Sequence, residues 1–130
     1  MKKPKSNFFM KVVKIPIYYG NFIIIFADDT NIDKVCKIVS YPTENISSLY
    51  AYSFNNFMFR NKESFAVAYN FWTISTITLG TIVHEVNHTG NNLLAAREFI
   101  PDWNNDEAES YLKGWMADEV SNFMQKCNIV

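Results

Sequence analysis

The apolar pattern of this chain changes its period near residue 75, and this change constrains the fold more than any other feature of the sequence. Before that point the apolar residues form short runs of the kind found in β-strands, at 12–19, 22–27, 49–59 and 65–72. After it they recur every three or four residues, which is the period of an α-helix. Strand-like runs followed by helical segments are typical of the α+β class.

The strand-like runs form two pairs, and each pair predicts a β-hairpin. Gly20-Asn21 separates the first two runs, and a glycine in this position suits a tight hairpin turn. Pro16 makes the first run an edge strand or the start of a strand, because proline cannot donate a hydrogen bond to a neighbouring strand. The polar stretch 60–63 separates the second two runs and predicts another turn.

Three stretches carry the period of a helix. The first lies between the hairpins, at about 31–40, where Thr30 and Asp33 resemble a capping box. The second runs from about residue 75 towards Phe99, either continuously or with a kink near Gly90, and the third starts near 104–106. We therefore predict the order β-β-α-β-β-α-α, a mostly antiparallel sheet with the helices on one face.

Length and composition indicate one globular domain over residues 1–130. Residues 1–10 are expected to be a flexible tail, and residues 75–126 form the helical half. The chain is 48% hydrophobic and 19% charged, which is a globular composition, and its net charge of −1 argues against a general nucleic-acid-binding role. No apolar run approaches the roughly 18 residues of a membrane span, and no signal peptide is apparent, so we expect a cytoplasmic protein.

The only two histidines of the chain lie four residues apart, in the sequence His84-Glu85-Val86-Asn87-His88. On a helix, residues at this spacing project from the same face, so both imidazoles can reach one metal ion. Glu85 directly follows the first histidine and can accept a proton from metal-bound water. This is the HExxH arrangement of zinc hydrolases, and it predicts a Zn2+ site at His84 and His88 with Glu85 as general base.

A catalytic zinc site of this kind needs a third protein ligand and one open position. The chain has no further histidine, Cys36 is far away in sequence, and Cys127 lies near the end of the chain. We therefore expect an acidic ligand. The acids within reach by sequence distance are Glu98, Asp102, Asp106, Glu107 and Glu109.

Periodicity does not choose between the two glutamates of the last helix, because Glu107 and Glu109 lie on opposite edges of its apolar stripe. Glu107 also has a competing explanation, since Asn104 and Glu107 match the spacing of a capping pattern. Tyr111 follows Glu107 by one helical turn. Its hydroxyl either points towards the metal, where it would polarise a substrate carbonyl, or lies at the edge of the core.

The motif segment resembles the gluzincin branch of the zinc metallopeptidases, in which a helix with HExxH is followed by a second helix that carries a glutamate ligand. Residues 80–88 (GTIVHEVNH) and 105–116 (NDEAESYLKGWM) look more closely like small phage- and prophage-encoded proteins. Those carry a His-Glu-x-x-His helix and an Asp-Glu-Ala-x-x-Tyr-Leu-x-Gly-Tyr/Trp helix. The resemblance covers about residues 76–120.

The resemblance implies a minimal zincin-like fold, with His84, His88 and Glu107 as zinc ligands and Glu85 as the general base. It prefers Glu107 to Glu109 because the neighbouring alanine, tyrosine and glycine fall in register with Glu107. It further implies a zinc metallopeptidase that acts on a peptide or protein substrate, in the cytoplasm of a bacterial host if the chain is phage-encoded. The alternative is a non-catalytic protein-binding module of phage origin, in which zinc is structural or absent.

Overall fold

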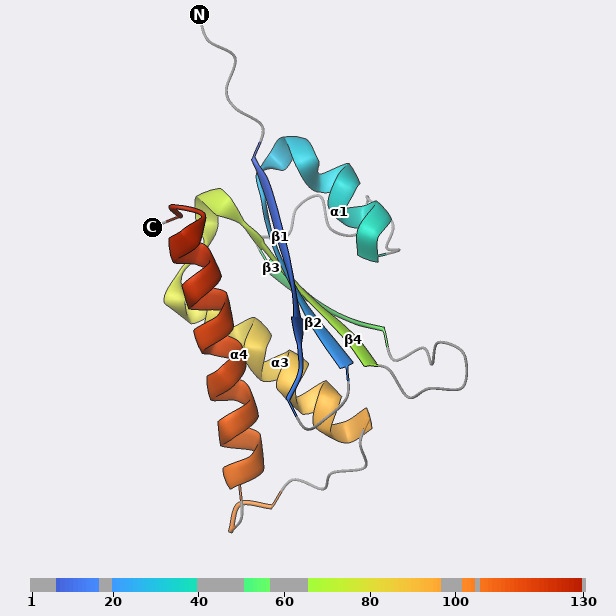
Figure 1. Cartoon of the computed structure of the whole chain (residues 1–130), viewed down its shortest axis with the longest axis vertical. Coiled ribbons are helices and arrows are strands. Elements are labelled where there is room, and N and C mark those ends of the chain that lie inside the picture. The colour runs from blue at the N-terminus through green and yellow to red at the C-terminus, as the bar shows by residue number, and fades with distance from the viewer. Residues whose placement is uncertain are drawn as a thin grey trace, which may run out of the picture.

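The computed structural model describes residues 7–16, 20–39, 51–56, 66–96, 102–104 and 106–129. Four strands form one sheet in the order β1-β2-β4-β3, and the helices pack against it (Figure 1). The strands are β1 (Phe8–Lys14), β2 (Gly20–Ala27), β3 (Ala51–Asn56) and β4 (Ala66–Thr73). The helices are α1 (Ile32–Val39), α3 (Leu79–Ala96) and α4 (Glu107–Lys126), with short 3-10 turns at Asp29–Asn31 and Ile74–Thr76.

The pairing of the strands confirms the α+β class and both antiparallel pairs. Strand β1 runs antiparallel to β2, and β3 runs antiparallel to β4. The two pairs are joined by a parallel contact between β2 and β4, from Gly20↔Ala66 to Ala27↔Thr73. The sheet is therefore mixed but mostly antiparallel, with β1 and β3 at its edges.

The first hairpin starts earlier in the sequence than predicted. Strand β1 begins at Phe8, inside the stretch expected to be a flexible tail, and residues 1–6 lie outside the described part of the chain. Gly20 and Asn21 belong to β2 rather than to the turn, because Asn21 pairs with Lys14 and the Gly20 carbonyl accepts a hydrogen bond from the Ile15 amide at 2.9 Å. The strands are thus joined up to the Ile15–Gly20 hydrogen bond, so the Gly-Asn pair does not form the turn.

The helices do not all share one face of the sheet, which corrects the expected arrangement. Strand β2 is apolar on both faces, and its side chains alternate between two separate clusters. Phe22, Ile24 and Phe26 face α3 and α4, whereas Ile25 and Ala27 face α1. A strand with two apolar faces needs cover on both sides, and α1 supplies it on the second (Figure 1).

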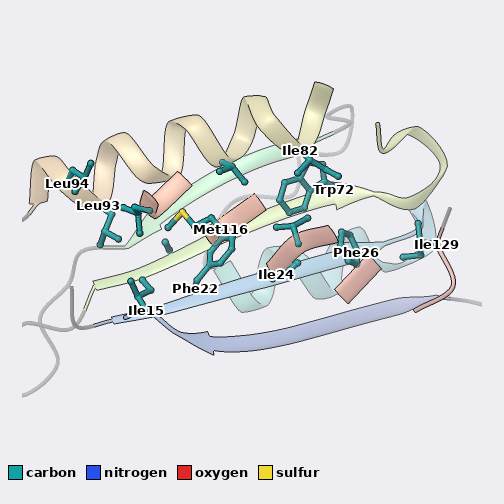
Figure 2. Close-up of a cluster of buried hydrophobic side chains, with 14 residues drawn as sticks. Ile15, Phe22, Ile24, Phe26, Trp72, Ile82, Leu93, Leu94, Met116 and Ile129 are labelled. Atoms are coloured by element: carbon teal, nitrogen blue, oxygen red, sulfur yellow. The ribbon is translucent and has the colours of Figure 1, made fainter. Parts of the chain in front are cut away.

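The larger cluster lies between the sheet and the α3–α4 pair (Figure 2). Its centre is aromatic: the ring centroid of Phe26 lies 5.9 Å from that of Trp72 and 5.3 Å from that of Phe123 on α4. The contact with Phe123 holds α4, the helix that carries residues 107–116 of the motif segment, against β2. None of the helices within the described residues combines the length and the apolar character that a membrane span requires.

A different residue from the expected pair caps the helical stretch that leads into α1. Asp28 is the N-cap, and its carboxylate accepts hydrogen bonds from the amide of Thr30 at 3.2 Å and from the hydroxyl of Thr30 at 2.7 Å. The same carboxylate accepts from the amide of Asn7, which precedes β1, at 2.6 Å. Asp28 therefore fastens the start of β1 to the start of the helical stretch, a long-range role that the local Thr30–Asp33 pattern could not indicate.

Candidate metal centre

The His-Glu-x-x-His motif lies on α3, which is continuous from Leu79 to Ala96 and passes through Gly90. The helix starts with reciprocal hydrogen bonds between Thr78 and Thr81: each hydroxyl accepts from the backbone amide of the other, at 3.2 and 3.0 Å. Ile82, Val86 and Leu93 form its buried face against the sheet. The period of the helix then directs the two histidines away from the core.

His84 and His88 are brought together as the sequence predicted. Their Nε2 atoms lie 3.1 Å apart, and the rings meet edge to face with centroids 4.7 Å apart. Two Zn–N bonds of about 2.0–2.1 Å at a tetrahedral angle place the nitrogens about 3.3 Å apart. The spacing of this pair therefore fits two ligands of one zinc ion, and the imidazoles face solvent, since 67% of the His84 side chain is exposed.

Glu85 is buried beside this pair. Only 7% of the residue is exposed, and its Oε1 lies 4.0 Å from Nε2 of His84. Burial raises the pKa of the Glu85 carboxyl, and the two nearby histidines partly oppose the shift. A carboxyl with a raised pKa beside two imidazoles is suited to accept and return a proton.

Polar contacts under α3 fix the helix on strand β4. The indole Nε1 of Trp72 donates to the carbonyl of Thr81 at 3.1 Å, at the start of the helix. Thr89 lies one helical turn beyond Glu85 on α3. Its hydroxyl donates to Oδ1 of Asn70, and both residues are fully buried. Within the described residues, Nδ2 of Asn70 has no hydrogen-bond partner.

Glu107 is the first residue of α4 and is exposed. The N-cap is Asp106, whose carbonyl accepts from the amide of Ser110 at 2.9 Å. Asn104 lies before the helix, and its backbone N–H donates a hydrogen bond to Oδ1 of Asp102 at 2.9 Å. Glu107 therefore does not occupy the third helical position that a capping box with Asn104 requires, and the competing capping explanation does not hold.

The neighbouring acid, Glu109, is already engaged. Its carboxylate pairs with the ammonium of Lys113, one turn later on α4. The same ammonium donates to the side-chain carbonyls of Asn87 and Asn91 on α3, each at 2.7 Å. Glu109 thus belongs to a polar cluster between the two helices.

The described residues therefore offer a metal ion two converging side chains, those of His84 and His88. Across the part of the chain that the structure describes, no group of three His, Cys, Asp or Glu side chains is gathered where it could hold a metal ion. Glu107 therefore does not join the histidines in such a group, and 76% of Tyr111 is exposed. Asp102 is exposed, and Glu98 lies outside the described residues.

Sequence reasoning missed the cluster of Lys113 with Asn87, Asn91 and Glu109. The only local signal was the i, i+4 spacing within each helix, Asn87 with Asn91 and Glu109 with Lys113. The contact between the helices spans 22 to 26 residues along the chain, so no local pattern could reveal it.

Strand β4 precedes the motif helix, with the 3-10 turn at Ile74–Thr76 between them. Strand β4 has neighbours on both sides, so its backbone groups are already paired, and β3 is the edge strand on that side. Helix α3 packs over both β3 and β4.

Comparisons with family models, with curated proteins and with solved structures found no match to this chain.

Proposed function

We propose that the protein is a zinc-dependent hydrolase of the metallopeptidase type, which cleaves a peptide or amide bond in a peptide or protein substrate. The observation that carries this proposal is the 3.1 Å separation of the Nε2 atoms of His84 and His88, which suits shared coordination of one ion. The adjacent buried Glu85 distinguishes a hydrolytic site from a purely structural one, because a structural zinc needs no general base.

In this proposal His84, His88 and Glu107 would hold a zinc ion, which would supply Lewis-acid activation of water and of the substrate carbonyl. Glu85 accepts the proton of the attacking water and passes it to the leaving amine. Burial suits Glu85 for both steps, since a raised pKa lets the carboxyl keep the proton until the amine departs. Tyr111, one turn after Glu107 on α4, is the proposed donor to the carbonyl oxygen.

The contacts of the two glutamates favour Glu107 over Glu109 as the third ligand. Glu109 is paired with Lys113. Glu107 is exposed and has no side-chain hydrogen bond or ion pair to another described residue. It can therefore change its rotamer towards an ion without breaking an existing interaction.

The test is to compare the wild-type protein with Glu85→Gln, both loaded with zinc, on unstructured protein substrates, with new amino termini identified by mass spectrometry. We expect cleavage by the wild type and no cleavage by Glu85→Gln, with zinc still bound to the variant because Glu85 is not a ligand. His84→Ala is the matched control, which should lose both zinc and cleavage. Equal cleavage by wild type and Glu85→Gln would refute the proposal.

The second candidate is a non-catalytic zincin-like module that binds a protein partner. What favours it is that no group of three metal-ligating side chains is assembled among the described residues. The same comparison separates the two candidates. A binding module would bind its partner equally well with Glu85 or Gln at this position, and neither form would cleave any substrate.

A further inference from the structure

The solvent face of α3 carries no charged side chain among the residues that the structure describes there. Its exposed positions are Leu79, Gly80, Val83, His84, Asn87, His88, Asn91 and Ala95. The single charged residue of the helix, Glu85, is buried. A helix that lies against a sheet normally turns charged and polar residues to water. An uncharged helix face is therefore unusual on a free surface and is typical of the centre of a protein–protein interface.

Two of these exposed residues are large and apolar. Leu79 is 77% exposed and Val83 is 54% exposed, and they lie one helical turn apart. Val83 directly precedes His84, so the apolar residues and the histidines form neighbouring rows on α3. Lys113, which contacts this side of α3 from α4, is paired with Glu109. Among the described residues, the face thus presents apolar surface and two imidazoles without an unpaired charge.

The histidine pair fills half of the coordination shell of a zinc ion. Zinc in structural protein sites is held by four ligands in a tetrahedron, and the Nε2 atoms of His84 and His88 lie at a separation that suits two of them. The described residues gather no third His, Cys, Asp or Glu beside the pair. Two positions of an ion held there therefore stay open, on the solvent side of the helix.

A second copy of this chain supplies what the two open positions need. A two-fold axis through the ion brings the same residues from both copies, so the second pair adds two imidazoles at the same spacing. Four imidazoles then complete the tetrahedron. Because the face carries no unpaired charge, the copies approach without like-charge repulsion, and the exposed Leu79 and Val83 are covered in the contact.

We infer that two copies of this chain share one zinc ion, through His84 and His88 of each, when zinc is scarcer than protein. The inference rests on the proposed use of these histidines as zinc ligands and needs no third ligand from the same chain. In the shared form all four positions hold imidazole, so no position is left for water and the proposed hydrolysis stops. The dimer is thus a resting form. Zinc in excess gives each pair an ion of its own, and the copies separate.

The ratio of zinc to protein tests this directly. Sedimentation velocity measures the mass of the full-length protein without zinc, with half an equivalent of zinc and with an excess. We expect one chain without zinc, two chains at half an equivalent, and a return to one chain with an excess or after addition of a chelator. Elemental analysis of the dimer fraction should give one zinc for two chains. Protein that stays monomeric at half an equivalent, or that dimerises equally without zinc, would overturn the inference.

Surface variants test which residues form the contact. His88→Ala removes one exposed imidazole and should abolish the zinc-dependent dimer. Val83→Lys keeps both histidines but brings a like charge from each copy into the contact, so we expect it to stay monomeric at half an equivalent of zinc. Val12→Lys is the matched control, because Val12 on β1 is also 54% exposed and the charge change is the same. It should dimerise as wild type does. A zinc-dependent dimer that persists in His88→Ala or in Val83→Lys would refute this contact.

The same measurements separate the inference from the proposed function. If wild type binds one zinc per chain at every ratio and never dimerises, the inference fails and the proposed zinc site stands. If the dimer with one shared zinc forms but no substrate is cleaved with zinc in excess, the inference holds and the proposed function fails. If wild type binds no zinc at all, both fail.

Discussion

The buried contact between Thr89 and Asn70 gives the most direct test of how α3 is seated on the sheet. Both residues are fully buried, and the Thr89 hydroxyl donates to Oδ1 of Asn70. Thr89→Val keeps the shape of the side chain and removes this donor. A buried acceptor left without its partner costs about 1–3 kcal/mol, and Asn70 already has an unpaired Nδ2 in the described part of the chain. We therefore expect Thr89→Val to lower the free energy of unfolding by about 1–3 kcal/mol.

Urea unfolding of the metal-free protein measures this change as a lower midpoint with an unchanged slope. The double variant Asn70→Val/Thr89→Val serves as control, because replacing both partners of a buried hydrogen bond by apolar groups restores much of the loss. We expect its destabilisation to be smaller than the sum of the two single variants. A stability of Thr89→Val within about 0.5 kcal/mol of wild type would refute this account of how α3 is held.

Three further perturbations test other parts of the structure. Burial raises the pKa of Glu85 above its ordinary value of 4.5, so Glu85→Gln should stabilise the metal-free protein near neutral pH. This gain in the free energy of unfolding should vanish as the pH falls towards 4.5. Urea unfolding in the presence of a chelator at several pH values measures the gain. Although burial opposes the shift, hydrogen bonds from Thr30, Asn7 and Asn31 lower the pKa of Asp28. Asp28→Ala should therefore cost about 1 kcal/mol in urea unfolding, a loss that shrinks as the pH falls through that lowered pKa. Phe123→Leu removes the stacking on Phe26 and should cost about 1 kcal/mol by the same assay, whereas no change would place α4 elsewhere.

Local patterns predicted the elements of this fold well where their physical causes were local. The helical spacing of His84 and His88 directly implied that their side chains would meet, and it is borne out by the 3.1 Å separation of their Nε2 atoms. Both antiparallel strand pairs also followed from runs of apolar residues separated by polar ones.

The differences arose where distant segments decide the outcome. Gly20-Asn21 has the composition of a turn, but pairing with Lys14 draws it into β2. The unbroken apolar run of β2 was a signal for cover on both faces, and it places α1 opposite α3 and α4. These outcomes depend on the register and order of strands, which no local pattern encodes.

In the candidate site, too, local patterns located some residues, whereas contacts between distant segments decide the placement of others. The histidine pair and Glu85 lie within one helical turn, so the sequence located them. The contact of Lys113 with Asn87 and Asn91 depends on how α4 crosses α3, which is set by contacts such as that of Phe123 with Phe26, far from the motif in sequence. Periodicity could not choose between Glu107 and Glu109, and it could not show that Glu109 pairs with Lys113.

We propose that His84 and His88 share one zinc ion. The most direct test is elemental analysis of the purified protein, before and after incubation with zinc and removal of the excess, beside His84→Ala and Glu107→Ala. We expect about one zinc per chain in the wild type, as in other sites with this motif, and its loss in both variants. Absence of zinc from the wild type after incubation, or full retention in His84→Ala, would contradict it.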